Sequence, residues 1–330
     1  MKHKNNTIFL FAALFFAGSA ILSLRYGSVY LSLPDLWHAV HNGPSDSIGY
    51  IFWYHRLPRT AASLLSGSAL AVSGCVIQSV LNNKLASPGI IGVNAGAGLA
   101  VTICCAAGLL SGWVIAVSSF AGAMLSVFLV VLIARKTGAS RSTVILSGVA
   151  VNSILNALSE AITTLLPSIA MQSSEFRIGG FSSVVHTRLF PAAILIACAL
   201  ILVFTLHNEL DILALGEDTA HSLGMKVRQM RTLFLILAAM LAGASVSFGG
   251  LLGFVGLIVP HAARKLVGSE NRKLLILCAL SGAAFVTLSD LISRMIFAPH
   301  ELPVGILMSV IGGPFFLLLL IRRKGGRSND

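Results

Sequence analysis

Apolar stretches long enough to cross a bilayer recur along the whole of this chain, separated by short polar links. A membrane helix needs about 20 mostly apolar residues, because each residue advances a helix by only about 1.5 Å. Hydrophobic residues make up 56% of the chain and charged residues 11%. A soluble domain carries about 25% charged residues. The sequence therefore predicts an all-α membrane protein, with one transmembrane domain over residues 1–330.

Ten membrane spans are expected, and this even number places both termini on one side of the membrane. The spans are 7–24, 57–80, 90–108, 114–134, 143–165, 189–207, 231–248, 252–267, 273–292 and 303–321. Lys and Arg gather in the cytoplasmic links of membrane proteins. With cytoplasmic termini, 17 of the 23 Lys and Arg residues fall inside and six fall outside. The net charge of +11 is then a sign of orientation, and no nucleic-acid partner is expected.

The sequence contains none of the common motifs for phosphate binding, hydrolysis or metal binding. It has no G-x-x-x-x-G-K-[ST], no H-E-x-x-H and no G-x-S-x-G. The nine histidines are scattered, and the five cysteines include no C-x-x-C pair. The chain is therefore expected to be no enzyme and to hold neither a metal nor a cofactor.

A glycine-rich stretch, GGLLGFVGLIVPHAARKLVG at 249–268, interrupts the apolar pattern near the C-terminal third. Small residues let membrane helices approach closely, and broken helices are tolerated where protein covers the freed backbone groups. The stretch predicts a sharp re-entry followed by a short eighth span inside the bundle. An ordinary kinked helix is the alternative. Either interpretation makes the glycines structural.

Three blocks of sequence carry a family resemblance. They are RLPRTAASLLSGSALAVSGCVIQSVLNNKLASPGIIGVNAGAGLA at 56–100, GLLGFVGLIVPHAARKLVG at 250–268 and LSDLISRMIFAPHELPVGILMSVIGGPFF at 288–316. In this order they resemble the FecCD-type permeases of iron-siderophore and cobalamin ABC importers, and the resemblance covers residues 25–322.

The resemblance implies a permease fold like that of the cobalamin importers, in the cytoplasmic membrane of a bacterium. It implies a second permease subunit, identical or paralogous, two ABC ATPase subunits that hold ATP and Mg²⁺, and an extracytoplasmic substrate-binding protein. A ferric siderophore is the cargo most typical of the family, and haem and cobalamin stay open. An ion-coupled secondary transporter and a membrane-embedded enzyme are rival interpretations that the residues favour less.

The link 207–231 is the expected contact with the ATPase. Gly216 and Gly224 bracket a short helix whose first turn holds two acids, where the helix dipole favours them. Gly224 is expected to cap this helix, and Lys226, Val227 and Arg228 to begin a second short helix. By resemblance the coupling residues are Leu215, Gly216, Glu217, Asp218, Ala220, Leu223, Gly224, Val227 and Arg228. A solvated loop is the alternative.

Arg56, Arg59 and Arg294 are half of the basic residues placed outside. The resemblance implies that they receive acidic residues of the binding protein, a role that suits the bidentate guanidinium. The alternatives are a local pair of Arg294 with Asp290, four residues away, and interfacial snorkelling of the other two.

Asn152, Asn156, Glu160 and Thr164 are spaced four residues apart in the fifth expected span. Residues at this spacing share one face of a helix, and an ionisable residue in a span faces the bundle interior or water. This polar stripe predicts a lining of the translocation pathway. Hydrogen bonding between helices is an equally good interpretation.

Overall fold

The computed structural model describes residues 2–27, 29–136, 140–298 and 300–324, with side chains placed except at 2–5, 319, 320 and 322–324. The remaining positions of the expected 1–330 domain lie outside the described residues. The helices are α1 (Lys2–Arg25), α2 (Leu33–Asn42), α3 (Ser47–Ile51), the π-helical turn η1 (Phe52–Arg56), α4 (Leu57–Val80), the 3₁₀ turn η2 (Pro88–Ile91), α5 (Val93–Ala106), α6 (Gly112–Lys136), α7 (Arg141–Leu165), the 3₁₀ turn η3 (Pro167–Ile169), α8 (Ala170–Ile178), α9 (His186–Thr205), α10 (His207–Ala214), α11 (Glu217–Ser222), α12 (Val227–Gly249), α13 (Val255–Val267), α14 (Asn271–Met295) and α15 (Val304–Lys324). The described residues are thus helical with connecting segments and contain no strand, as the all-α expectation requires.

Seven of the described helices are long and apolar enough to cross a membrane, by length and composition. They are α1, the continuous helix Ser47–Val80, α6, α7, α9, α12 and α14. The other three expected spans coincide with α5, α13 and α15, of which α5 has 14 residues and α13 has 13. The total of ten spans therefore stays a prediction.

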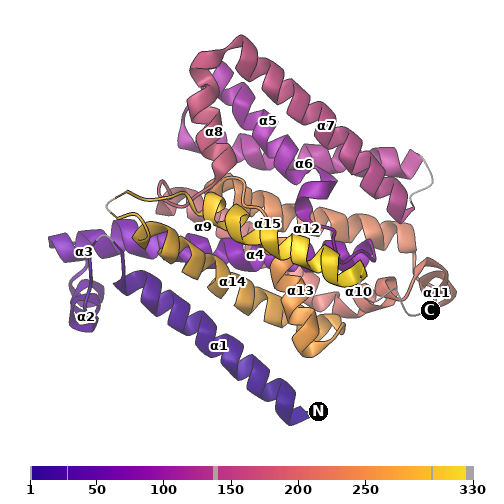
Figure 1. Cartoon of the computed structure of the whole chain (residues 1–330), viewed down its shortest axis with the longest axis horizontal. Coiled ribbons are helices and arrows are strands. Elements are labelled where there is room, and N and C mark those ends of the chain that lie inside the picture. Colours follow the sequence, from indigo (N-terminus) through magenta and orange to yellow (C-terminus); the bar gives the residue numbers. More distant parts are fainter. Residues whose placement is uncertain (1, 28, 137–139, 299, 325–330) are drawn as a thin grey trace.

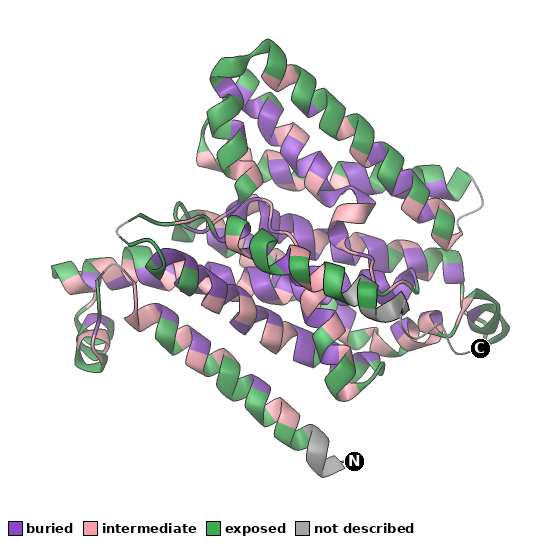
Figure 2. Ribbon diagram, in the orientation of Figure 1, coloured by how far each residue is buried: buried purple, intermediate pink, exposed green. Residues whose placement is uncertain are grey.

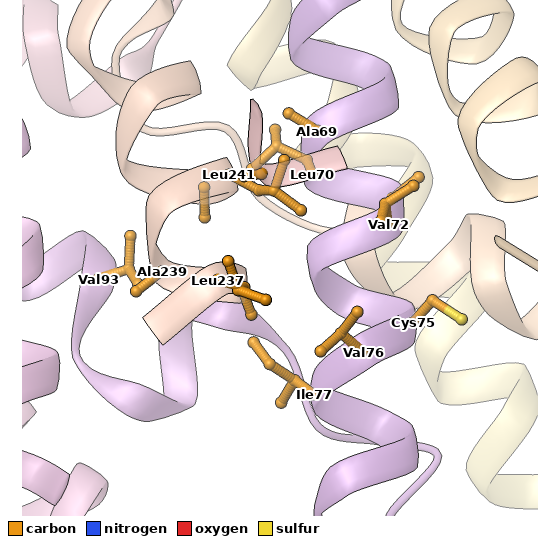
Figure 3. Close-up of a cluster of buried hydrophobic side chains, with 14 of the residues drawn as sticks. Ala69, Leu70, Val72, Cys75, Val76, Ile77, Val93, Leu237, Ala239 and Leu241 are labelled. Atoms are coloured by element: carbon orange, nitrogen blue, oxygen red, sulfur yellow. The ribbon is translucent and has the colours of Figure 1, made fainter. Parts of the chain in front are cut away.

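The centre of the bundle is α4, which packs against α12, α13 and α14 (Figure 1). Buried residues cover most of α4 and α12, whereas α1 and α7 are largely exposed (Figure 2). In Figure 3 the side chains of Leu70 and Ile77 on α4 lie beside Leu237 and Leu241 of α12, in the main buried cluster. The central helix is thus covered by protein on nearly all of its surface.

Glycines make the close contacts of α4 possible. A Cβ atom on Gly74 would lie 2.1 Å from the carbonyl oxygen of Gly256 in α13. A Cβ atom on Gly67 would lie 2.2 Å from the carbonyl oxygen of Gly282 in α14. At both crossings backbone touches backbone, so only glycine fits, as the sequence pattern indicates.

The stretch 249–268 forms a turn and a short helix rather than one kinked helix. Gly250 has φ 68°, Phe254 has φ 64°, and α13 then runs from Val255 to Val267. A Cβ atom on Gly250 would lie 2.5 Å from the carbonyl oxygen of Phe176. The expected sharp re-entry and short helix are confirmed.

A second group of helices, α5, α6, α7 and α8, lies to one side of the bundle (Figure 1). The long helices lie roughly along one axis, some running each way, so the bundle has two ends (Figure 1). The α11 end holds α10 and α11, and the first turns of α1 and the last turns of α15 point toward it (Figure 1). The α2 end holds α2 and α3, at the opposite side of the molecule.

Candidate functional site

The expected coupling segment forms a compact turn of helix at the α11 end. Gly224 has φ 80° and follows Leu223, the C-cap residue of α11. Its N–H donates to the carbonyl of His221 at 2.9 Å, and the N–H of Met225 donates to the carbonyl of Ala220 at 3.0 Å. This pair of bonds is the Schellman cap of a helix end, so the expected cap at Gly224 is confirmed.

Two boundaries of this segment differ from the sequence expectation. Val227 and Arg228 do not begin a second short helix, because they are the first residues of the long helix α12. The expected second helix instead precedes Gly216, as α10, with Leu210 and Leu213 buried. Burial of Val227 and Arg231 holds the first turn of α12 against the bundle, so no break is needed there.

The segment is tied to the bundle on its inner side and apolar on its outer side. Arg231 is buried and donates from Nη2 to Glu217 Oε2 at 2.8 Å. Ala220 is buried beneath α11, whereas Asp218 is exposed. Leu215 and Leu223 are 64% and 62% exposed, which leaves two large apolar side chains uncovered at this end.

The short helix α10 connects this segment to two long helices. Arg141, the first residue of α7, donates from Nη2 to the carbonyl of Leu213 at 3.1 Å. Asn271, the first residue of α14, donates from its backbone N and its Nδ2 to Asp211 Oδ1, at 2.9 and 2.8 Å. Any displacement of α10 must therefore strain its bonds to α7 and α14.

At the α2 end two of the three expected docking arginines, Arg59 and Arg294, meet one buried carboxylate. Asp290 on α14 accepts from Arg59 Nε at 3.0 Å and from Arg59 Nη2 at 3.1 Å. It also lies 3.3 Å from Nε of Arg294, four residues along α14. The second carboxylate of the cluster, Glu301, accepts from Arg59 Nη1 at 2.7 Å. Arg59 thus joins α4 to α14 and to the segment before α15.

Arg56 and Arg294 are buried, with 5% and 4% of their surface exposed. Arg56 ends the π-helical turn η1 and donates to the carbonyls of Tyr26 and Val29, at 2.7 Å for Val29. Arg294 donates from Nη2 to Ser23 Oγ at 2.9 Å. Both guanidinium groups therefore hold this chain's own elements together, and the local pair of Arg294 with Asp290 is present.

The polar stripe of α7 packs against the bundle at Asn152 and is exposed at its other three residues. Asn152 is half-buried and donates from Nδ2 to the carbonyl of Gly89 at 2.8 Å. Asn156, Glu160 and Thr164 are exposed on the same face. Asn152 and Asn156 line a cavity of about 230 Å³ between α5, α7 and α8. The stripe thus serves helix contact at Asn152 and faces open space beyond it.

Two residues of these sites were not predicted from the sequence. Glu301 completes the Arg59 cluster from a position 242 residues away, and no local pattern relates such positions. Arg177, counted in the sequence among the outside basic residues, lines the cavity on α7. Nothing in the sequence around a single arginine of a polar segment predicts that its side chain will lie beside a spanning helix. Among the residues that the structure describes, no group of three or more His, Cys, Asp and Glu could hold a metal ion.

The family model for the FecCD transport family matches residues 14–322 of the chain. The uncharacterized ABC transporter permease protein YvrB of Bacillus subtilis is 36% identical, over 99% of this chain and 97% of its own length. The hemin transport system permease protein HmuU of Yersinia pestis is 34% identical, over 94% of this chain and 93% of its own length.

A solved metal-chelate type ABC transporter in an inward-facing conformation has the same fold. Its TM-score to this structure is 0.85 at 29% sequence identity, and the match covers 96% of this chain and 99% of that one. The glycine crossings, the short helix after the re-entrant turn and the α10–α11 segment thus occur in a chain that matches this family almost from end to end. The chain belongs to the FecCD transport family.

Proposed function

We propose that the chain is the permease subunit of a binding-protein-dependent ABC importer that moves a ferric-siderophore complex across the bacterial cytoplasmic membrane. The sequence holds no phosphate-binding loop, so ATP with Mg²⁺ belongs to a partner ATPase. The family and the seven apolar helices support this proposal. Haem and cobalamin are the alternative cargoes, and the similarity to a hemin permease supports the first of them.

The observation that carries the proposal is the exposed apolar pair at the α11 end. Leu215 and Leu223 flank α11, and Asp218 is exposed between them. Single exposed apolar side chains are common on protein surfaces, but an apolar patch rimmed by polar residues marks a protein contact, and we propose that these two leucines form such a patch. The partner proposed here is a groove on the ATPase subunit, with the α11 end in the cytoplasm as the distribution of basic residues predicts.

Hydrogen bonds connect the proposed ATPase contact to α7, the helix that bears the polar stripe. The ATPase would displace α11, and the bonds of Leu213 and Asp211 would carry the displacement into α7 and α14. Because α7 bears the stripe, closure of the nucleotide sites would shift the helix that lines the pathway. Alternating access then follows from a bias between two arrangements of the same bundle.

The exposed part of the stripe supports a second permease subunit. Asn156, Glu160 and Thr164 would face lipid if this chain stood alone in a membrane, and a carboxylate in lipid is costly. A second copy, or a paralogue, would turn this face toward a shared aqueous pathway.

Docking of the binding protein at the α2 end rests on Arg59. Its side chain keeps 14% of its surface exposed and pairs with the half-exposed Glu301. An acidic residue of the binding protein would compete with Glu301 for this guanidinium. Arg56 and Arg294, which are buried, would then have a structural role, because they hold in place the elements around Arg59.

Uptake in a deletion strain tests the proposal. The probes are ⁵⁵Fe-labelled siderophores, haem and cyanocobalamin, and the variant carries Leu215→Ala with Leu223→Ala. Wild type is expected to restore uptake of one cargo, and the double variant to lose most of it with the permease still in the membrane. The matched control is Leu125→Ala, a leucine near the middle of α6 that is 60% exposed. Equal uptake by the double variant and the control would contradict the ATPase contact.

A further inference from the structure

Two neighbouring cavities on the α7 side of the bundle share one charged residue. The first, of about 230 Å³, has Asn94, Asn152, Asn156, Ser159 and Arg177 as its polar lining. The second, of about 510 Å³, lies between α8 and α15, with Arg177 and Ser309 as its polar side chains. Among the residues that the structure describes, no carboxylate lines either cavity. Their combined lining is therefore neutral and polar around a single positive charge.

Arg177 is half-buried on α8, where it lines a cavity together with residues of the polar stripe of α7. Asn152, which lines the same cavity, is near the middle of the 25-residue helix α7. The cavity therefore extends along the second half of α7, from its middle toward its C-terminal end. A charged side chain beside a membrane span usually has a partner or a functional ligand.

Within the described residues Arg177 has no hydrogen bond and no ion pair. Two arginines of the α2 end do have partners: Arg59 has Asp290 and Glu301, and Arg188 donates to the carbonyl of Ser183 at 2.9 Å. Glu160, the acid on the polar stripe, lies one turn beyond Asn156 and lines neither cavity. The guanidinium of Arg177 is thus a free charge that faces open volume.

We propose that Arg177 binds an oxygen anion of the cargo on its way through the bundle, and that the cargo is consequently an anionic metal chelate. This inference rests on the proposed import function and narrows its substrate class. A guanidinium pairs with a carboxylate or catecholate through two parallel hydrogen bonds. The surrounding amides and hydroxyls supply further hydrogen bonds without a competing charge.

The lining also suits passage rather than tight capture. One positive charge among neutral groups attracts an anion, and the absence of a second fixed charge in the lining lets the anion leave again. A cationic or neutral complex would gain nothing from Arg177 and would meet the cost of an uncompensated charge in low dielectric. The cavity should therefore discriminate among chelates by charge.

Uptake of chelates that differ in charge tests this inference, with Arg177→Gln, Arg177→Lys and the matched control Arg188→Gln. The probes are ferric citrate, a ferric tricatecholate, haem, cyanocobalamin and a cationic ferric trihydroxamate, supplied to the deletion strain with its native partners. Wild type is expected to import at least one of the three anionic probes. Arg177→Gln should lower that uptake tenfold or more, and Arg177→Lys should restore part of it. Arg188→Gln should stay within twofold of wild type at equal membrane abundance.

Three outcomes would overturn the inference. Wild-type uptake confined to cyanocobalamin or the cationic trihydroxamate would show that the cargo is not anionic. Unchanged uptake in Arg177→Gln, or an equal loss in Arg188→Gln, would remove the role of Arg177 and leave the import function standing. Uptake of no probe would contradict the import function itself, and this inference with it.

Discussion

Two helices of nearly equal length, α4 and α7, have opposite surroundings. α4 contains 24 residues and α7 contains 25. The most apolar 18-residue window has a mean hydropathy of 1.6 in the continuous helix Ser47–Val80, which includes α4, and of 1.4 in α7. Of those windows 78% is buried for the helix with α4 and 22% for α7. Figure 2 shows the same contrast as a mostly purple α4 and a mostly green α7. Hydropathy therefore does not tell which helix lies at the centre.

The difference lies in small residues and in the position of polar groups. α4 presents Gly67 and Gly74 to two neighbouring helices, and each contact brings backbone against backbone. On α7, Gly148 makes one such contact, with the carbonyl of Ile90, and the polar stripe then runs away from the bundle. Lipid is as apolar as a protein core, so close fit rather than apolar character decides which helix is surrounded by others. We expect changes on the α4 side to damage the fold and changes on the exposed α7 stripe to damage transport.

The largest loss of stability is expected for Asp290→Ala, at the contact of α14 with α4. The change leaves Arg59 and Arg294 without their shared, buried carboxylate, and breaking a buried ion pair costs about 3–5 kcal/mol. Thermal unfolding of the purified subunit in detergent measures the loss. Glu270→Ala removes a carboxylate from an exposed pair with Lys273 and should cost less than about 1 kcal/mol. Equal losses in both variants would contradict the central role of Asp290.

The second-largest loss of stability is expected for Gly74→Val, because a Cβ atom at this position would lie 2.1 Å from the carbonyl oxygen of Gly256. Overpacking of a core costs about 1–3 kcal/mol and sometimes more, and here neither backbone can yield without moving a helix. Membrane abundance and unfolding temperature should both fall. Gly18→Val on α1, where a Cβ meets nothing within 4 Å, is the matched control. A stable Gly74→Val protein would show that α4 and α13 can separate freely.

Asn152→Ala tests the part of the α7 stripe that packs against the bundle. It removes the bond from Nδ2 to the carbonyl of Gly89, which is worth about 1 kcal/mol. The expected fall in unfolding temperature is smaller than for either change on the α4 side. A loss of stability as large as that of Asp290→Ala would show that α7 is as important to the core as α4, and would contradict the contrast between the two helices.

The smallest effect on stability is expected for Glu160→Ala, on the exposed part of the stripe. Surface substitutions usually stay within about 0.5 kcal/mol, so the unfolding temperature should hardly move. Uptake of the cargo should nevertheless change, because the proposed pathway loses a charged side chain. Transport and unfolding temperature that both match wild type would remove the best support for a pathway along this face.

The sequence predicted features that depend on neighbouring residues. The cap at Gly224 follows from one glycine after a short helix, and the turn before α13 follows from crowded glycines in an apolar run. The start of α12 at Val227 did not follow, because it depends on burial of Arg231 against the bundle. Likewise the local pair of Arg294 with Asp290 was open to prediction, whereas the bond from Arg59 to Glu301 was not.

By itself the sequence determined the class of the protein, its seven long apolar helices, the glycines at helix crossings and the family resemblance. These follow from composition and local spacing, because the bilayer acts on each span separately. Only the tertiary structure decided that α4 is central, that Arg56 and Arg294 are buried among partners, and that Arg177 faces a cavity without one. Those outcomes depend on contacts between positions far apart in the chain. Apolar side chains suit lipid and protein equally, so the pattern along one helix cannot name its neighbours.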